Sequence, residues 1–328
     1  RLFACLQDDV TLRRPRVELA LRLLEDSSRR IEAGHAFAAD APLRRLRLLV
    51  LSDEQGPAPT PLLARTLTLD SRIASFMLDR PPVDETFSRH MTLLPLKQEN
   101  TALPFPAELD SRLNALAALP AADLAVPLIC LIGNDAAARK TVAHRLASSS
   151  QMNLLAVDFP SLAASQSVEE AFLLAVREAA LCPAALLLDH LEHLKPDQLG
   201  WLDLRLSETH SSPPERLWPR LTLLGATAPL PFPALTISLP DPDFASRRAL
   251  WQKNLAGEPR AFDTEAVDAL AGKFQLAGSK ITAAMSAARG SAAWRNPRDP
   301  ALSLDDLYSA ARNQSTPILH GLARKLTP

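Results

Sequence analysis

Short apolar runs alternate with helical patterns between residues 126 and 239, and this alternation constrains the fold of the 328-residue chain more than any other feature. The runs that read as strands cover 126–132, 153–158, 184–189, 220–226 and 235–239. Helical periodicity separates them at 139–149, 168–181 and 196–209. The alternation predicts a parallel sheet covered by helices on both faces, with its chemistry at the carboxyl ends of the strands.

The segment that follows the first run has the layout of a phosphate-binding loop. An apolar run, 126–132, leads through a glycine and a short polar loop into a helical pattern. A working loop reads G-x-x-x-x-G-K-[ST], and two alignments to it are available. With a one-residue insertion, Lys140 takes the lysine position and Thr141 the magnesium-ligand position. Without a gap, Ala138 replaces the last Gly, Arg139 replaces the Lys, and Lys140 replaces the Ser/Thr.

The phase of the following helix favours the ungapped alignment. That alignment places four apolar residues on one face, namely Val142, Ala143, Leu146 and Ala147. The gapped alignment instead puts His144 on the stripe, whereas we expect this histidine to be exposed.

The ungapped alignment changes the chemistry of the loop. Ala138 brings a Cβ where the backbone must pass close to phosphate, and it resists a positive φ. Arg139 keeps the charge of the lysine but is a planar fork rather than a point charge. Lys140 places a cation where a hydroxyl should hold Mg²⁺. The helix N-terminus can still attract an anion, but these residues argue against an organised Mg-nucleotide.

Composition is that of a globular protein, with 47% hydrophobic residues, 5% aromatic residues and a net charge of −1. The three cysteines lie far apart and form no C-x-x-C motif, which indicates a reducing compartment. No apolar run reaches the ~18 residues that a membrane helix needs, and no signal peptide is visible. The chain begins at Arg1 in the middle of a pattern, and we expect it to be part of a longer protein.

The first 79 residues have the element order of a winged helix. Helices are expected to open at Thr11–Pro15 and at Asp40, followed by a strand at 46–51, a loop at 55–61, a strand at 62–69 and a helix capped by Asp70. That fold often places a helix in the major groove of DNA. Acidic residues nearly balance the arginines here, which favours a protein partner over DNA. Residues 80–106 carry several prolines and no periodicity, and they read as a linker.

An ordered set of features resembles the AAA+ ATPases. The set consists of the phosphate loop, an apolar strand that ends in Asp189, a strand that ends in Ala226-Thr227, and a strand that runs into Leu239-Pro-Asp-Pro-Asp243. The helical segment from about residue 241 looks like the lid of that family. The stretch Leu6–Thr11 and the tail 311–315 resemble a narrower group, the bacterial ATPases with a winged-helix-like region, a degenerate first AAA module and an active second one.

The resemblance implies a damaged nucleotide site. Asp189 matches the family's magnesium-organising Asp, but His190 replaces the catalytic Glu that follows it. Thr227 matches the sensor strand, but Ala228 replaces the polar Asn expected next. No Arg occurs at 229–239, near where the family's arginine fingers belong.

Several roles stay open at this point. Asp189 is either a magnesium ligand or a structural partner of Arg139, and His190 either a general base or a packing residue. Glu192 is a weaker substitute for the missing Glu, and Lys280 stands where some relatives carry a nucleotide-sensing Arg. The spacing of the histidines predicts no metal site; they are His190, His193 and His210.

We therefore predict an α/β fold with a parallel αβα P-loop-type sheet and a C-terminal helical lid, preceded by a small winged-helix-like α+β region. The predicted domains are a winged-helix-like region at 1–79, a linker at 80–106, a degenerate AAA+ αβα module at 107–240 and a lid at 241–328. The candidate nucleotide-binding residues are Gly133, Asn134, Ala138, Arg139, Lys140, Thr141, Asp189 and Thr227.

The predicted function is that of a pseudo-ATPase module, a scaffold or partner-binding part of a larger ATP-driven remodelling enzyme. One alternative is a nucleotide-binding or active ATPase that uses Lys140 and Thr141, and another is a DNA-binding winged-helix regulator. The family implies ATP or ADP with Mg²⁺ as ligands, although the motifs of this chain look catalytically degraded. It also implies a cytoplasmic location and neighbouring subunits of an AAA ring as partners, with no membrane.

Overall fold

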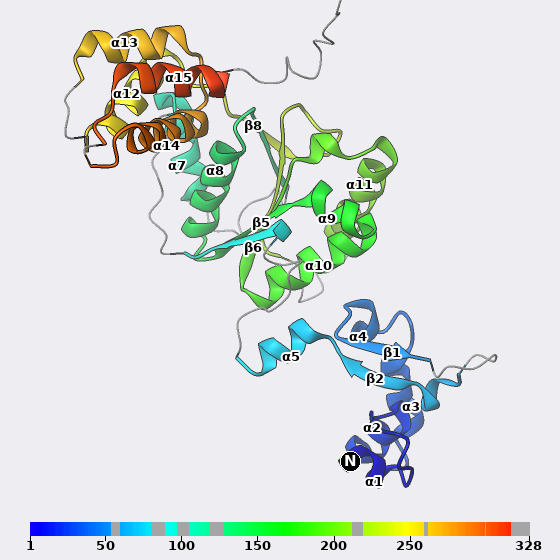
Figure 1. The fold of residues 1–328 in the computed structure, drawn as a ribbon. Helices are drawn as coiled ribbons and strands as arrows, with labels where there is room; N and C mark the ends of the chain where they lie inside the picture. Colours follow the sequence, from blue (N-terminus) through cyan, green and yellow to red (C-terminus); the bar gives the residue numbers. More distant parts are fainter. Residues whose placement is uncertain are drawn as a thin grey trace, which may run out of the picture. The chain divides into compact units, whose positions relative to one another are not determined.

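The computed structural model describes residues 1–53, 60–79, 89–96, 105–118, 128–211, 219–258, 262–298 and 300–315. Most of the loop expected at 55–61 lies outside these residues. The chain forms two compact units, Arg1–Met91 and Thr92–Pro328, and each has a hydrophobic core of its own (Figure 1).

The first unit pairs short helices with a two-stranded antiparallel sheet. Its elements are α1 (Leu2–Leu6), α2 (Val17–Leu24), α3 (Arg30–Gly34), α4 (Pro42–Arg45), β1 (Leu49–Ser52), β2 (Thr66–Leu69) and α5 (Ser71–Met77). As predicted, Asp70 caps α5, because its carboxylate accepts from the backbone N–H of Arg72 at 2.9 Å. The first long helix begins later than expected, at Val17. Arg16 is extended and bridges to Thr66, so the chain before α2 runs as an added strand segment.

The second unit contains a six-stranded sheet in the order β3-β5-β6-β7-β4-β8. The strands are β3 (Met91–Leu94), β4 (Leu128–Ile132), β5 (Asn153–Asp158), β6 (Ala184–Asp189), β7 (Thr222–Ala226) and β8 (Leu235–Ser238). The pairs β5–β6, β6–β7, β7–β4 and β4–β8 are all parallel. The stretch predicted as a linker thus contributes β3, a correction: an edge strand of four residues is too short to show periodicity.

Helices cover the sheet as the alternation predicted. Helices α7 (Ala107–Ala117) and α8 (Ala136–Ser149) pack through Leu113, Val142 and Leu146 against one face of the strands. In Figure 1, α9 (Phe159–Ser165), α10 (Val168–Leu181) and α11 (Pro196–Ser211) lie on the other side of the sheet. Every residue of β4, β6 and β7 is buried, as expected for parallel strands covered on both faces.

Four helices form the predicted lid. They are α12 (Phe244–Leu255), α13 (Thr264–Lys273), α14 (Gly278–Arg295) and α15 (Leu304–Ser315), and they enclose a core around Trp251, Leu270 and Ile281. Asp243 and Asp263 cap α12 and α13, each accepting at 2.8 Å from a backbone N–H three residues later. Among the described helices of the whole chain, none has the length and apolarity needed to cross a membrane.

Candidate functional site at the carboxyl edge of the sheet

The connection between β4 and α8 is shorter than the sequence alignments assume. Helix α8 begins at Ala136, three residues before the predicted start at 139, so only Gly133, Asn134 and Asp135 separate it from β4. Asp135 is the N-cap, and its Oδ1 accepts from the backbone N–H of Ala137 at 3.0 Å. The last part of the predicted loop, from Ala136 to Ala138, is therefore already helical.

Gly133 is required by packing rather than by a positive φ, since none of the described glycines has one. A Cβ at this position would lie 2.7 Å from the carbonyl oxygen of Leu239 at the end of β8. The backbone N–H of Gly133 donates to the carbonyl of Ala226 at 3.0 Å. The glycine thus lets β4 and β8 approach closely where the sheet ends.

Arg139 points inward, beneath the loop, and forms a buried ion pair with Asp189. Its Nε donates to Asp189 Oδ1 at 2.7 Å, and the two side chains are only 1% and 6% exposed. Its Nη1 also donates to the carbonyl of Gly133. Of the two roles left open for Asp189, the structure shows the pairing with Arg139. The guanidinium faces the sheet edge, where the Asp189 carboxylate neutralises its charge inside the protein.

Gly225, next to the last residue of β7, makes room for this ion pair. A Cβ added there would lie 2.1 Å from Asp189 Oδ1 and 3.2 Å from Arg139 Nε. Gly225 was not among the predicted site residues, although a Gly that interrupts the apolar run of a buried strand is a signal of close approach.

The loop between β4 and α8 also forms hydrogen bonds with the lid and with the segment that leads into it. Asp135 Oδ2 accepts at 3.0 Å from the backbone N–H of Ser279 in the first turn of α14. Asn134 Nδ2 donates at 3.0 Å to Asp241 Oδ2, just before α12. Asp135, which is 9% exposed, therefore caps α8 and meets the N-terminus of α14 with one carboxylate. Sequence reasoning did not single out Asp135, because its second partner is 144 residues away.

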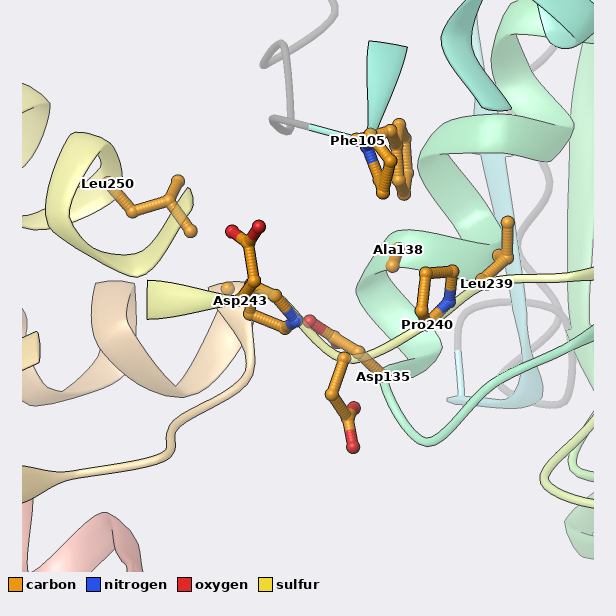
Figure 2. A pocket seen from close by; sticks show the side chains of 11 residues that line it. Phe105, Asp135, Ala138, Leu239, Pro240, Asp243 and Leu250 are labelled. Carbon is orange, nitrogen blue, oxygen red and sulfur yellow. The ribbon is translucent and has the colours of Figure 1, made fainter. Parts of the chain in front are cut away.

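A cavity of about 160 Å³ lies between the loop and the lid. In Figure 2, Asp243 and Leu250 approach it from the lid side, while Phe105, Ala138 and Leu239 lie opposite. Its walls carry three carboxylates, those of Asp135, Asp241 and Asp243, and no Lys or Arg is among the described residues that line it. Ligand pockets usually start at about 300 Å³, so this cavity is small as well as acidic.

Comparisons with known proteins agree with this architecture. Residues 1–91 match a family model described as a winged helix domain, variant, and residues 243–317 match one described as a contractile injection system ATPase helical domain. The crystal structure of the FIGL-1 AAA domain in complex with ADP superposes with a TM-score of 0.56 at 16% identity, covering 77% of this chain and 94% of that one. The second unit has the AAA-domain fold.

A further structure of the FIGL-1 AAA domain gives a TM-score of 0.54 at 17% identity, covering 72% of this chain and 91% of that chain. The search of curated proteins returned no match. The predicted α/β fold, helical lid, winged-helix unit and AAA+ resemblance are therefore confirmed.

Helix α8 of the AAA fold buries the predicted apolar stripe, Val142, Ala143, Leu146 and Ala147. It buries His144 of the gapped alignment as well, so burial within the helix does not distinguish the two alignments. The expectation that His144 is exposed was wrong, because the segment after β3 covers that side of the helix. The ring of His144 is 3% exposed, and its Nε2 donates to the carbonyl of Pro95 at 2.9 Å.

The remaining candidates of the AAA site do not converge on the ion pair. Thr141 Oγ1 donates at 2.8 Å to the carbonyl of Ala137, one turn back in its own helix. Lys140 and Lys280 are partly exposed, and Thr227 is exposed at the end of β7. From the predicted set, the structure thus brings together Arg139, Asp189 and Gly133, whose carbonyl accepts from Arg139 Nη1.

His190, in the place of the family's catalytic Glu, adopts a left-handed backbone conformation with φ 64° and ψ 27°. Its Nδ1 lies 3.4 Å from Arg139 Nη2, and its Nε2 lies 3.8 Å from Asp189 Oδ2. The turn that it starts brings Glu192 and His193 beside it, a grouping that spacing alone did not predict.

Proposed function

We propose that the AAA-fold unit is a pseudo-ATPase module, which serves as a scaffold or partner-binding part of a larger ATP-driven assembly. The buried Arg139–Asp189 pair carries this proposal. In P-loop enzymes an Asp at this strand end helps to hold Mg²⁺ and a basic side chain cradles the phosphates. In this chain these two charges neutralise each other at 2.7 Å, so neither is available to a ligand without breaking a buried ion pair.

The N-terminus of α8 gives independent support. Helix N-termini bind phosphate through free backbone N–H groups and the helix dipole. Here the Asp135 carboxylate already accepts from the N–H groups of Ala137 and Ser279. A phosphate would have to displace one anion and approach two others, Asp241 and Asp243, that line the cavity. The residues of this site do not fit a Mg-nucleotide, and we derive no hydrolytic step from them.

The larger assembly that we propose is an ATPase of the contractile injection type, on the basis of the helical-domain match at residues 243–317. Hydrolysis would then belong to another AAA module or subunit, and this unit would contribute shape and contact surface. The alternative ATPase that uses Lys140 and Thr141 has less support, because the Thr141 hydroxyl is bonded within α8.

Calorimetry of the full chain with ATP and ADP, with and without Mg²⁺, tests the proposal. We expect no binding at millimolar nucleotide, while the FIGL-1 AAA domain, which has been crystallised with ADP, serves as the positive control. A steady-state ATP turnover that is abolished by Asp189→Asn would overturn the proposal, as would binding of ATP that Mg²⁺ strengthens. Lys140→Met tests the alternative alignment, and we expect it to change neither measurement.

The winged-helix unit offers a surface that favours a protein partner over DNA. A groove of about 580 Å³ is lined partly by apolar side chains, including Leu21, Ile31 and Leu63. Ile31 and Leu24 are 87% and 79% exposed. A DNA site would instead depend on phosphate contacts and would lose affinity steeply with salt. We expect no such salt-dependent DNA binding, which a titration at low and moderate ionic strength measures directly.

A further inference from the structure

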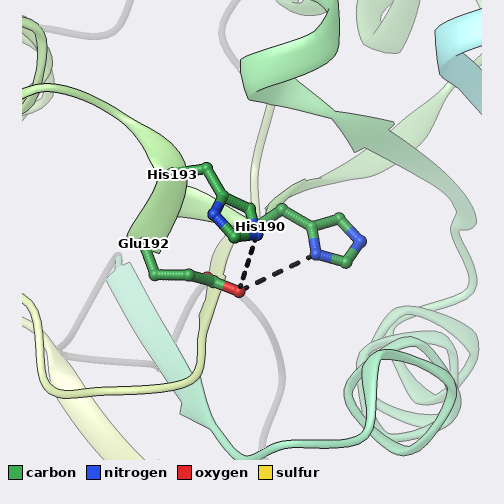
Figure 3. Close-up of side chains that lie close together, drawn as sticks. All are labelled: His190, Glu192 and His193. Atoms are coloured by element: carbon green, nitrogen blue, oxygen red, sulfur yellow. Dashed lines mark ion pairs between the residues drawn. The ribbon is translucent and has the colours of Figure 1, made fainter. Parts of the chain in front are cut away.

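The turn after β6 gathers three metal-ligating side chains at the edge of the candidate nucleotide site, next to the Arg139–Asp189 pair. His190, Glu192 and His193 each offer one ligand atom, and these atoms all lie within 4.8 Å of one another. Figure 3 shows both imidazole rings directed at the same Glu192 oxygen. His190 Nδ1 lies 3.9 Å and His193 Nε2 lies 3.8 Å from Glu192 Oε1.

We propose that His190, Glu192 and His193 form a binding site for a zinc ion, with water completing the coordination. Zn²⁺ accepts imidazole nitrogen and carboxylate oxygen at about 2.0–2.2 Å, which sets ligand atoms ~3.4 Å apart in a tetrahedron. The two distances to Glu192 Oε1 exceed that spacing by about half an ångström. The His193 side chain is 68% exposed, so it is able to close the gap without repacking the core.

Glu192 itself points to a cation. Its side chain is only 16% exposed, and its Oε2 is buried with no hydrogen-bond donor among the described residues. A buried carboxylate oxygen without a partner is costly, and a cation bound by both oxygens of Glu192 would remove that cost.

The backbone forms a tight turn between His190 and His193. His190 has a left-handed conformation, which is strained for a residue with a Cβ, and its carbonyl accepts from the N–H of His193 at 3.0 Å. That turn places residues 190 and 193 on the same side. Backbone strain of this kind recurs at binding sites, where the surrounding structure maintains it.

The ion pair next to the site places a carboxylate near the second ring nitrogen of His190. Metal-ligating histidines usually direct their second ring nitrogen toward a carboxylate, which fixes the ring. His190 Nε2 lies 3.8 Å from Asp189 Oδ2, beyond hydrogen-bond distance, so the ring would have to move toward Asp189 for this carboxylate to fix it. The same carboxylate neutralises Arg139, so the guanidinium near the site is already paired.

Arg139 limits the affinity. Its Nη2 lies 3.4 Å from His190 Nδ1, a contact longer than an ordinary hydrogen bond of about 2.7–3.2 Å. Zinc would displace this weak contact and leave a cation nearby. We therefore expect a micromolar rather than a nanomolar dissociation constant.

Zinc titration of the tag-free full chain, after treatment with a chelator, tests the site. We expect one Zn²⁺ per chain, and no comparable binding of Mg²⁺, because imidazole selects zinc over harder cations. Substitution of Co²⁺ would give the visible absorption of a nitrogen- and oxygen-ligated ion. Each of His193→Ala and Glu192→Gln should weaken binding by at least about tenfold, the lower end of what even an outer partner contributes.

The matched control is His35→Ala, which removes an exposed histidine of the winged-helix unit. It should leave the zinc affinity unchanged. The proposal would be overturned if no zinc binds at zinc concentrations 100-fold above the micromolar range. It would also be overturned if both His193→Ala and Glu192→Gln leave the zinc affinity intact. His193 is mostly exposed, so its variant should fold, which thermal unfolding without zinc verifies. The outcome does not depend on whether the nucleotide site is active.

Discussion

Asp189 and Asp135 stand at two places in the AAA-fold unit where a nucleotide site would be built, but they are stabilised in different ways. Asp189, at the end of β6, meets a full positive charge, since Arg139 Nε lies 2.7 Å away in a buried pair. Asp135, at the start of α8, accepts from backbone N–H groups of two helices. One carboxylate depends on a single side chain, and the other depends on amide groups and helix dipoles.

The difference determines how each region should respond to substitution. Removing the Arg139 side chain leaves the Asp189 carboxylate buried without its partner. The loss of stability should therefore fall on the core of the sheet. Removing the Asp135 carboxylate leaves N–H groups that water can reach more easily, so the cost falls on the link between the αβα layers and the lid. Both arrangements place internal charges or dipoles where a phosphate-binding loop would hold a phosphate.

Arg139→Met should have the largest effect on stability. It leaves Asp189 buried without its partner, and breaking one side of a buried pair costs about 3–5 kcal/mol. Urea unfolding measures the loss. The double variant Arg139→Met with Asp189→Leu should recover much of it, because an apolar pair avoids the unpaired charge. Lys140→Met, on the same helix but partly exposed, is the control and should stay within about 0.5 kcal/mol.

An equal loss from Arg139→Met and Lys140→Met would show that the ion pair does not hold this edge of the sheet.

Gly225→Ala should have the next largest effect, because its Cβ would overlap Asp189 Oδ1 at 2.1 Å. Overpacking of a dense core costs about 1–3 kcal/mol, which urea unfolding measures. Gly200→Ala in α11 is the matched control, since no atom lies within 4 Å of its added Cβ. There Ala should stabilise the helix by up to about 1 kcal/mol. If both alanines are tolerated alike, Gly225 is not needed by the ion pair.

The sequence was able to predict the features that depend on local patterns. The bounds of β5 at 153–158 and of α10 at 168–181 followed from local patterns, and the structure has them at the same residues. The burial of the apolar stripe of α8 was equally accessible, because apolar residues at helical spacing are a local pattern.

Other features depend on residues that are distant in the sequence. Asp135 meets Ser279 across 144 positions, and Gly225 matters because Arg139 and Asp189 converge on it. His144 was expected to be exposed because its cover comes from Pro95, outside the helix itself. The pairing of Arg139 with Asp189 was one of two roles that residue types allowed, and only the three-dimensional structure distinguishes them.

Asp135→Ala should have a smaller effect on stability, of about 0.5–2 kcal/mol, as for the loss of an N-cap. Its distinctive result should be faster amide hydrogen exchange at Ser279, because that N–H loses its acceptor. Asp263→Ala is the matched control: Asp263 caps α13 through Ala266 within the lid alone. Both variants should lower stability, but only Asp135→Ala should deprotect the start of α14. Unchanged exchange at Ser279 in the Asp135 variant would argue against the link.

The smallest expected effect is a change in the reactivity of Cys130. This cysteine lies in β4, and its modification rate reports how often the core opens. Burial raises the pKa of the Cys130 thiol to about 11, so at pH 8 the folded state holds about one thiolate in a thousand. Alkylation followed by mass spectrometry should therefore modify the exposed Cys5 first and Cys130 only when the protein opens.

Arg139→Met should speed the modification of Cys130, because it lowers the free energy of opening the sheet edge. Asp135→Ala should speed it much less, because the broken contact lies between α8 and the lid. Equal acceleration by the two variants would mean that the ion pair and the cap stabilise a single cooperative unit, and the distinction between the two carboxylates would then describe only their contacts.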